Sequence, residues 1–277
     1  MRWQGRAGSG NIQDRRGMGM ALPIGGGIGG LVLLLLFSAL TGQNPVDIIT
    51  TQSDETVGTT GVPADDPQAE FVSVVLKDTE DTWSEIFQER GADYPEPTLV
   101  LFTQATQSAC GLGQSAMGPF YCSLDRQVYL DLSFFYDLET RFGAPGDFAQ
   151  AYVVAHEVGH HVQTVTGVSE RVTAARQRSS EREANALSVR QELQADCYAG
   201  VWGHYAAQRG LLEPGDAEEG LNAAAAIGDD RIQRQTQGQV VPESFTHGSS
   251  EDRVRWLRRG LDSGRIDACD TFTSGTF

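Results

Sequence analysis

The amino-acid sequence predicts an α+β fold, mainly helical with a small β-sheet, preceded by a single transmembrane helix. Three observations support this expectation. Apolar residues recur at helical spacing over two long segments, 149–164 and 181–208. Two short runs, 98–102 and 127–134, have the length and composition of strands. A stretch near the N-terminus, 21–41, is apolar and long enough to cross a bilayer.

The apolar stretch near the N-terminus has flanks of opposite charge. No charged residue lies between Arg16 and Asp47, the upstream flank is basic, and the downstream flank is acidic. The positive-inside rule therefore predicts a cytoplasmic N-terminus and an extracytoplasmic remainder. A cleaved signal peptide is the alternative, but the stretch exceeds the usual signal core of about 7–15 residues and no Ala-x-Ala site follows it. We expect a cell-membrane protein with a cytoplasmic basic tail over residues 1–20 and a transmembrane helix over residues 21–42.

The rest of the chain divides into a linker and one large domain. Residues 43–68 are rich in Thr, Gly, Asp and Pro, which is typical of a flexible linker. Residues 69–277 carry the periodic segments and are expected to form an extracytoplasmic domain. Its expected elements, in chain order, are a helix ending at Gly91, strands over 98–102 and 127–134, and helices over 149–164, 181–208, 217–227 and 251–259.

Four cysteines lie in the part of the chain expected outside the membrane. An even number of cysteines in an oxidising compartment indicates two disulfides. Proximity along the chain favours a bond between Cys110 and Cys122, which leaves Cys197 to pair with Cys269. A zinc–thiolate site is the alternative, but no Cys-x-x-Cys spacing supports it.

The net charge of the chain excludes one class of function. The formal charge is -16 at pH 7 and the isoelectric point is near 4.6. A nucleic-acid-binding surface needs clustered Lys and Arg to neutralise phosphates, so we expect no nucleic-acid partner.

The motif HEVGH, residues 156–160, carries the residue types of a metal site. Residues four apart on an α-helix lie on the same face, so His156 and His160 can hold one Zn²⁺ ion per chain. Glu157 lies one step round the helix, where it can take a proton from a zinc-bound water without binding the metal. Such short motifs also occur by chance, and the alternative is a polar helix face with two ordinary histidines.

A catalytic zinc ion usually takes three protein ligands, so a third must come from elsewhere in the chain. Glu192 begins the motif ELQAD in a helical segment that has much apolar surface. Asp196, one turn further on, can accept the distal N–H of a ligating histidine and fix its tautomer. The alternative is two solvent-facing acids on an amphipathic helix.

The pairing of HEVGH with a later ELQAD resembles the gluzincin metallopeptidases, in which an HExxH helix and an ExxxD helix supply the zinc ligands. Residues 121–277 are more closely similar to a bacterial family of neutral zinc metallopeptidases. The motifs that carry this resemblance are QVYLDLSFF, AYVVAHEVGHHVQ, QELQADCYAG, GDD and FTHGSSEDRVRWL. The resemblance implies a zincin-like fold with His156, His160 and Glu192 as zinc ligands and Glu157 as the base.

The expected function is therefore that of a membrane-anchored, zinc-dependent peptidase. Zinc lowers the pKa of its bound water towards ~7, Glu157 accepts the proton, and the water attacks a peptide carbonyl. If residues 127–134 form the edge of the sheet, a peptide or protein substrate can lie along them as an added strand. The alternative is a catalytically inactive, zinc-stabilised module that binds peptides or proteins in the cell envelope. The presence of Glu157 argues against this module, because a structural zinc site needs no base.

The donor that stabilises the oxyanion has two candidates, His247 and Arg253. His247 lies in a turn before an expected helix and resembles a threonine-histidine motif downstream of ExxxD in some membrane-linked gluzincins. The alternative makes His247 part of a turn and Arg253 the partner of a buried carboxylate. We expect His161 to point away from the metal, because adjacent helical residues diverge by ~100°.

Overall fold

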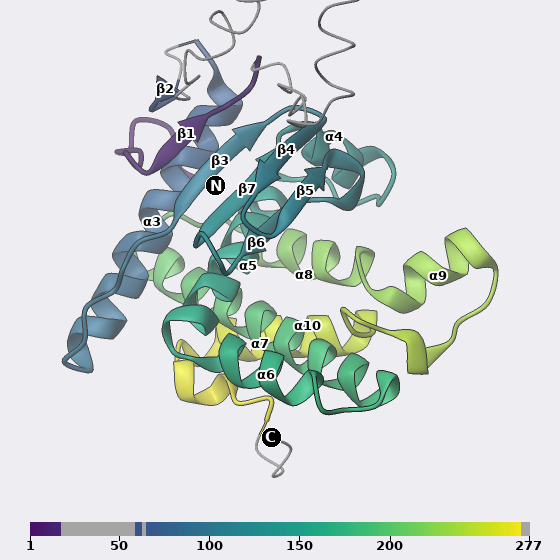
Figure 1. Cartoon of the computed structure of the whole chain (residues 1–277). Coiled ribbons are helices and arrows are strands. Elements are labelled where there is room, and N and C mark those ends of the chain that lie inside the picture. Colours follow the sequence, from purple (N-terminus) through teal and green to yellow (C-terminus); the bar gives the residue numbers. More distant parts are fainter. Residues whose placement is uncertain (18–58, 63–64, 273–277) are drawn as a thin grey trace, which may run out of the picture.

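The computed structural model describes residues 1–17, 59–62 and 65–272, which form a mainly helical α+β fold with a small mixed sheet. The predicted fold class is thereby confirmed for these residues. In Figure 1 the sheet forms the upper part of the molecule, helix α5 crosses the middle, and three further helices lie below it. These elements are α5 (Asp147–Val165), α6 (Val168–Arg176), α7 (Glu181–Gln208) and α10 (Ser250–Ser263).

The larger sheet has five strands in the order β2-β1-β3-β7-β6. These strands are β1 (Ile12–Asp14), β2 (Thr59–Thr60), β3 (Thr98–Phe102), β6 (Phe120–Cys122) and β7 (Gln127–Asp131). The three central strands are parallel, and the two outer strands pair antiparallel with their neighbours. The expectation that residues 127–134 form the sheet edge is wrong, because β7 pairs with β3 on one side and with β6 on the other. The edge beside α5 is β6.

Residues 1–17 are built into the same folded unit as the rest of the described chain. Strand β1 pairs in parallel with β3, and Ile12 is completely buried. The guanidinium of Arg16 donates to Asp66 at 2.6 Å, just before helix α3 (Pro67–Glu89). This differs from the separate basic tail that the sequence predicts. A strand of three residues shows no periodicity, and its pairing depends on contacts with distant residues.

Helix α3 follows the periodic apolar pattern from which it was predicted. The side chain of Asp66 caps it by accepting the N–H of Ala69 at 3.0 Å, and a proline occupies the first turn. Gly91, the predicted terminator, has a φ of 70°, which is the left-handed conformation that ends helices. The apolar stripe of α3 packs into the main core with the sheet and α5.

Two glycines allow α7 and α10 to cross at very short range. A Cβ atom on Gly200 would lie 2.2 Å from the carbonyl oxygen of Leu257, and one on Gly260 would lie 2.0 Å from that of Cys197. No residue with a side chain fits either position without moving a helix. The intrinsic helix penalty of Gly200 is thus offset by a close packing that brings Arg253 of α10 into the interior.

Several elements lie in stretches where no helix or strand was predicted. A hairpin has one strand on each side of Cys110, and the strand predicted over residues 127–134 ends at Asp131 because a helix begins at Ser133. The additional elements are β4 (Ala105–Ser108), β5 (Gly111–Gln114), α4 (Ser133–Thr140), α6, and α9 (Asp229–Gln237). Helix α8 (Asp216–Ala226) is close to its predicted range.

Both expected disulfides form, Cys110 with Cys122 and Cys197 with Cys269. The predicted transmembrane helix over residues 21–42 and most of the linker over residues 43–68 lie outside the described residues. Within the part of the chain that the structure describes, no helix is both long and apolar enough to cross a membrane.

Candidate metal centre

Helix α5 presents His156 and His160 one turn apart on the same face. Their ring centroids are 4.8 Å apart and their planes are nearly perpendicular, at 89°. Their side chains are only 9% and 15% exposed. The Nε2 atoms of both rings approach a single carboxylate from another helix.

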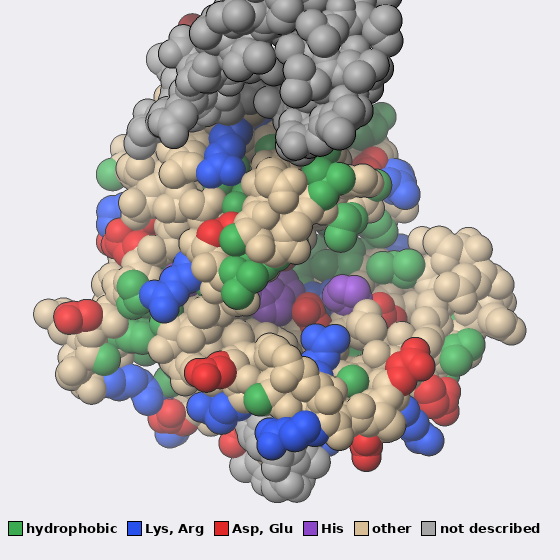
Figure 2. Space-filling view, viewed as in Figure 1, with side chains coloured by type: hydrophobic (Ala, Val, Ile, Leu, Met, Phe, Trp, Pro, Cys, Tyr) green, Lys and Arg blue, Asp and Glu red, His purple; other side chains and the backbone are tan. Residues whose placement is uncertain are grey.

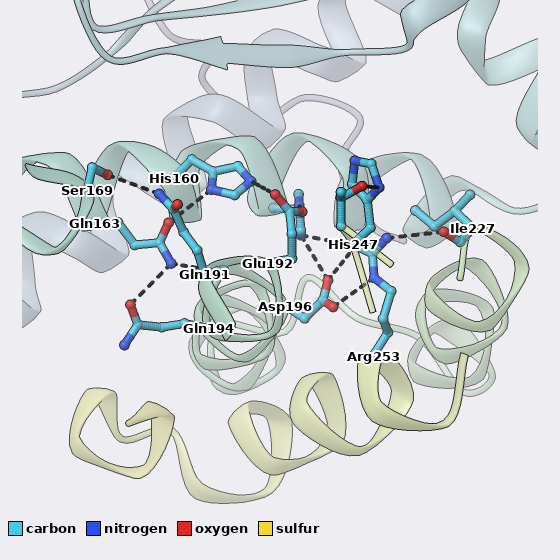
Figure 3. Close-up of polar contacts among 12 residues, drawn as sticks. His160, Gln163, Ser169, Gln191, Glu192, Gln194, Asp196, Ile227, His247 and Arg253 are labelled. Atoms are coloured by element: carbon cyan, nitrogen blue, oxygen red, sulfur yellow. Dashed lines mark hydrogen bonds and ion pairs between the residues drawn. The ribbon is translucent and has the colours of Figure 1, made fainter. Parts of the chain in front are cut away.

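That carboxylate is Glu192 on α7. Its Oε2 lies 3.1 Å from Nε2 of His156, and its Oε1 lies 3.4 Å from Nε2 of His160. One candidate ligand atom from each of these three residues lies within 4.8 Å of the others. In Figure 3 the side chains of His160 and Glu192 point toward one another. Figure 2 shows histidine and acidic side chains together in a hollow between the sheet and the lower helices.

Gly159, within the HEVGH motif, permits this convergence. A Cβ atom on it would lie 2.9 Å from the carbonyl oxygen of Ala195 and 3.1 Å from the Cα atom of that residue. The backbone of α5 therefore packs directly on the backbone of α7 at Gly159, which lies between His156 and His160 in sequence. The short distance between the helices lets three side chains of ordinary length meet.

Asp196 lies behind His156 and is completely buried. Its Oδ1 accepts the Nδ1–H of His156 at 2.8 Å, which leaves Nε2 of this ring free to bind a metal. The hydroxyl of Tyr152 also donates to Asp196, at 2.6 Å. Arg253 completes the cluster with two donors, Nε and Nη2, each 2.9 Å from the carboxylate. This arrangement favours the alternative in which Arg253 is the partner of a buried carboxylate.

The other histidine is oriented by an amide. Oε1 of Gln163 lies 2.9 Å from Nδ1 of His160, and Nε2 of Gln163 donates to the carbonyl oxygen of Gln191 at 2.7 Å. A second bond, to Gln194 at 3.1 Å, fixes the amide further. Because Nε2 of Gln163 is the donor in both bonds, its Oε1 must face the ring and accept the Nδ1–H of His160. Nε2 of His160, like that of His156, is therefore the ring atom directed at Glu192, and it is the atom that would bind a metal after losing its proton.

The buried charges create a strongly negative potential at the two histidines. Burial alone would lower the pKa of His156, but the charge and the hydrogen bond of Asp196 outweigh burial and raise this pKa to about 10. Burial opposes ionisation of Glu192, yet the positive charge of His160 and hydrogen bonds from both histidines hold the pKa of Glu192 well below its usual range. The site therefore favours positive charge between its three converging side chains.

The donor set fits a zinc ion. Two imidazole nitrogens and one carboxylate form a known set of catalytic zinc ligands, with a fourth position left for water or substrate. With neutral imidazoles, the carboxylates of Glu157, Glu192 and Asp196 exceed the single guanidinium of Arg253 by two negative charges, and all four residues are largely buried. A divalent cation would neutralise this excess, which is costly to bury uncompensated.

Glu157 lies next to the ligand set but takes no part in its contacts. Its side chain is buried, with 8% exposure. Among the described residues, none donates a hydrogen bond to its carboxylate, and burial raises its pKa. A carboxylate in this position is available to exchange a proton with a molecule bound in the hollow.

His247 lies in the turn before α10, where the side chain of Ser249 caps the helix. Its side chain is 56% exposed, and its Nδ1 is 3.2 Å from Oδ1 of Asp229. The hydrogen bond to Asp229 raises the pKa of His247 above its ordinary value, and the charge of Glu192 acts in the same direction. Its ring therefore carries a positive charge more readily than a free imidazole does.

His161 points away from the converging ligands, as expected. Its Nε2 donates to the carbonyl oxygen of Pro95 at 2.5 Å, and the hydroxyl of Tyr121 lies 3.1 Å from its Nδ1. Burial lowers the pKa of this histidine to about 4. A neutral His161 thereby ties α5 to the edge strand β6 and to the loop before β3.

A second group of carboxylates, Asp147, Asp216 and Glu219, lies at the start of α5. The amino group of Met1 donates to Asp147 at 2.8 Å and lies 3.3 Å from Asp216. One ammonium offsets only part of the charge of this group, but the side chains of Asp147 and Glu219 are partly exposed to solvent, so the group carries no argument for a second metal.

Comparisons with known proteins agree with this geometry. The family model described as "Putative neutral zinc metallopeptidase" matches residues 1–272. The chain belongs to this family. It is 50% identical to the uncharacterized protein YpfJ of Escherichia coli K12 over 98% of this chain and 99% of YpfJ. It is 45% identical to the uncharacterized protein Rv2575 of Mycobacterium tuberculosis over 65% of this chain and 64% of Rv2575. No solved structure matches the chain.

Three residues that shape the site in this neutral zinc metallopeptidase family member were not predicted: Tyr152, Gln163 and Asp229. Tyr152 precedes His156 by four residues and Gln163 follows His160 by three, so helical spacing alone places them on the ligand face. Sequence spacing does not predict the contact between Asp229 and His247, because Asp229 begins a helix and His247 lies in a turn far along the chain.

Proposed function

We propose that the protein is a zinc-dependent peptidase that hydrolyses peptide bonds in peptide or protein substrates. The observation that carries this proposal is the convergence of His156, His160 and Glu192 beside the buried carboxylate of Glu157. A zinc site that served only stability would have four protein ligands and would need no base beside them.

Glu157 is the proposed general base. Burial raises its pKa, so its carboxylate is a better proton acceptor than an exposed glutamate. A bound zinc ion would acidify a water molecule and polarise the carbonyl of the substrate. Glu157 would take the proton of the attacking water and return it to the leaving amine.

His247 is the better of the two candidate oxyanion donors. Arg253 directs two of its donor nitrogens to Asp196 and is only 3% exposed, so it is committed to the carboxylate behind His156. His247 is accessible, and its hydrogen bond with Asp229 raises its pKa above the ordinary value. A positively charged imidazole at the mouth of the site can stabilise negative charge that develops on the carbonyl oxygen.

The edge strand β6 is the proposed guide for the substrate. Among the described residues, β6 pairs with β7 on one side and with no strand on the other, and Tyr121 links it to α5 through His161. An extended peptide can therefore add to β6 by backbone hydrogen bonds and pass along the helix that carries the ligands. This replaces the edge first expected over residues 127–134.

The proposal is tested by the variant Glu157→Gln, with Glu251→Gln on the exposed surface of α10 as the matched control. Full-length protein is analysed for zinc and incubated with a peptide library whose products are identified by mass spectrometry. We expect one zinc per chain in all three proteins and a loss of about 10²- to 10⁴-fold in hydrolysis for Glu157→Gln alone. Equal hydrolysis by the wild type and Glu157→Gln would refute the mechanism.

Zinc binding without any hydrolysis by the wild type would favour the alternative function, a zinc-stabilised module that binds peptides or proteins. Protein without bound zinc would remove the basis of both.

A further inference from the structure

Asp229 organises the turn that carries His247. Its Oδ2 accepts three consecutive backbone N–H groups, those of Thr246 at 2.8 Å, His247 at 2.6 Å and Gly248 at 3.0 Å. Its own N–H donates to the carbonyl oxygen of Gly248 at 2.9 Å. One largely buried carboxylate thus fixes the backbone on both sides of the histidine.

The same carboxylate also holds the histidine ring. Oδ1 of Asp229 lies 3.2 Å from Nδ1 of His247, while Oδ2 serves the backbone. A ring that donates its Nδ1–H to a carboxylate presents its Nε2 on the opposite side. Nδ1 of His247 also lies 3.1 Å from the hydroxyl of Thr246, whose own backbone N–H is held by Asp229. The ring is more than half exposed, so its orientation depends on these polar contacts around Asp229 more than on packing.

The turn is also placed against the metal-ligating part of α7. A Cβ atom on Gly248 would lie 3.2 Å from Leu193 and 3.4 Å from Val189, the residues that flank Glu192 along the helix. In Figure 3 His247 is drawn between Glu192 and Ile227, the residue that follows α8, and the charge of Glu192 acts on the His247 ring. Asp229 itself therefore contacts the turn and not the three converging ligands.

We propose that Asp229 is a positioning residue for the reaction, which holds the ring of His247 so that its Nε2 faces the substrate carbonyl. This inference rests on the proposed peptidase function. Charged groups around the ring act in both directions: Asp229 and Glu192 favour the imidazolium, and Arg253 opposes it. Loss of the Asp229 charge is thus expected to make His247 a weaker donor as well as a less ordered one.

A double-mutant cycle tests the proposal, with Asp229→Asn, His247→Gln, the combined variant, and Asp230→Asn as the control. Asp230 is the adjacent residue, and its carboxylate accepts the backbone N–H and the hydroxyl of Ser250. We expect Asp229→Asn and His247→Gln each to lower kcat about 10- to 100-fold with little change in KM or zinc content. The combined variant should be no slower than His247→Gln, and Asp230→Asn should retain wild-type kcat.

A second measurement follows the His247 ring directly by NMR titration in the zinc-loaded protein. Asp229→Asn should lower the pKa of His247, whereas Asp230→Asn should leave it in place. Additive losses in the double mutant, or an unchanged His247 titration in a folded Asp229→Asn protein, would overturn the positioning role. Wild-type activity that does not depend on Glu157 would instead remove the proposed function itself.

A separate observation concerns the position of the N-terminus relative to a membrane. Strands β1 and β2 pair antiparallel, with Gln13 opposite Thr60 and Asp14 opposite Thr59. In an antiparallel pair the chain leaves one strand and enters the next at the same end of the ladder. Asp14 and Thr59, which stand before and after residues 18–58 in the chain, therefore lie together at one end of the sheet.

This pairing limits how the chain can meet a bilayer. A single crossing would separate its two ends by ~30 Å, and a double crossing would need about 40 apolar residues. The apolar stretch 21–41 has about half that length. We infer that residues 1–17 lie on the same side of any membrane as the metal centre. This replaces the predicted single-pass topology, in which residues 1–17 and the metal centre lie on opposite sides.

The charge asymmetry that suggested the opposite topology has a structural explanation. Arg16 pairs with Asp14 at 2.7 Å and with Asp66 at 2.6 Å, and Arg6 donates to the carbonyl oxygen of Arg209 at 3.1 Å. These arginines are engaged in tertiary contacts within the domain. The positive-inside rule counts such arginines as charges of a cytoplasmic loop, whatever contacts they make in the folded domain.

Cysteine accessibility in whole cells tests this inference. Gly10→Cys and Glu251→Cys each add one thiol at an exposed position, and no atom lies within 4 Å of a Cβ built on Gly10. Intact cells are treated with a membrane-impermeant maleimide, and labelling is compared with that of denatured lysate, with the wild-type chain as the blank. We expect the two thiols to be both labelled or both protected in intact cells. Labelling of one with protection of the other would overturn the inference.

Discussion

Gly159 of α5 lies against the backbone of Ala195 of α7, so close that a Cβ atom on the glycine would be 2.9 Å from the alanine carbonyl oxygen. This contact lies between the two histidines in sequence and sets the distance between the helices. It therefore determines whether Glu192 can reach both imidazoles. The glycine of the HEVGH motif is a structural part of the candidate metal centre, although the motif itself leaves that position variable.

Gly159→Ala should weaken both the fold and the site. Alanine gains about 1 kcal/mol in helix propensity, but overpacking costs about 1–3 kcal/mol and pushes α5 away from α7. We expect a small net loss of stability in urea unfolding of metal-free protein and a zinc affinity at least about tenfold lower. Gly10→Ala, at a position with open space, is the control. Wild-type zinc affinity in Gly159→Ala would show that the helix distance does not limit ligand convergence.

Gln163→Met should lower zinc affinity with little change in side-chain volume. The substitution removes the acceptor for Nδ1–H of His160 and the donors to Gln191 and Gln194. Loss of a residue that orients a ligand typically costs about 10- to 100-fold in metal affinity. Competition with a chromophoric chelator measures it, with the exposed Gln177→Met as the control. An unchanged affinity would mean that helix packing alone orients His160.

Asp196→Asn should be strongly destabilising even without metal. Arg253 is 3% exposed and would keep its charge without the carboxylate that now receives two of its nitrogens. Breaking a buried ion pair from one side costs about 3–5 kcal/mol. The double variant Asp196→Asn/Arg253→Met should recover part of this loss in urea unfolding with a chelator present. Strict additivity of the two single changes would indicate that the two side chains are not energetically coupled.

The helices and the ligand set were accessible from the sequence because both depend on local spacing. Helix α7 matches its predicted range, and Ser180 with Glu183 forms the capping box that starts it. Likewise, residues four apart on one helix must share a face, and the coordination chemistry of zinc calls for a third ligand, for which the sequence offered Glu192 as the candidate.

Features that depend on distant contacts were not accessible in this way. Strand β1 is stabilised by pairing with β3, far along the chain, and its residues carry no periodic pattern. The sheet edge was misplaced because a three-residue strand, β6, covers β7. The role of Asp229 depends on its contacts with a later turn, and the nearest contact residue in sequence, Thr246, is 17 residues away. Sequence spacing constrains residues within one element, whereas these contacts are set by the assembled fold.

The two disulfides should differ in their contributions to stability. Cys197 and Cys269 are 72 residues apart, and Cys110 and Cys122 are 12 apart. The chain-entropy model gives about 4 kcal/mol for the long loop and about 3 kcal/mol for the short one. Guanidinium unfolding of the two paired Cys→Ala variants, with a chelator present, measures this difference. A larger loss from the Cys110/Cys122 variant would contradict the entropic account.

Loss of the disulfide between Cys197 and Cys269 should also lower the zinc affinity, whereas loss of the disulfide between Cys110 and Cys122 should not. The carbonyl oxygen of Cys269 accepts the amide of Gln194 at 3.0 Å, and Gln194 in turn accepts from Gln163, which orients His160. Freeing Cys269 from α7 loosens the last member of this chain of hydrogen bonds. We therefore expect zinc affinity to fall several-fold in Cys197→Ala/Cys269→Ala and to stay at the wild-type value in Cys110→Ala/Cys122→Ala. Chelator competition on folded protein measures both, and equal affinities would show that the bonds from Gln194 to Gln163 hold without the disulfide.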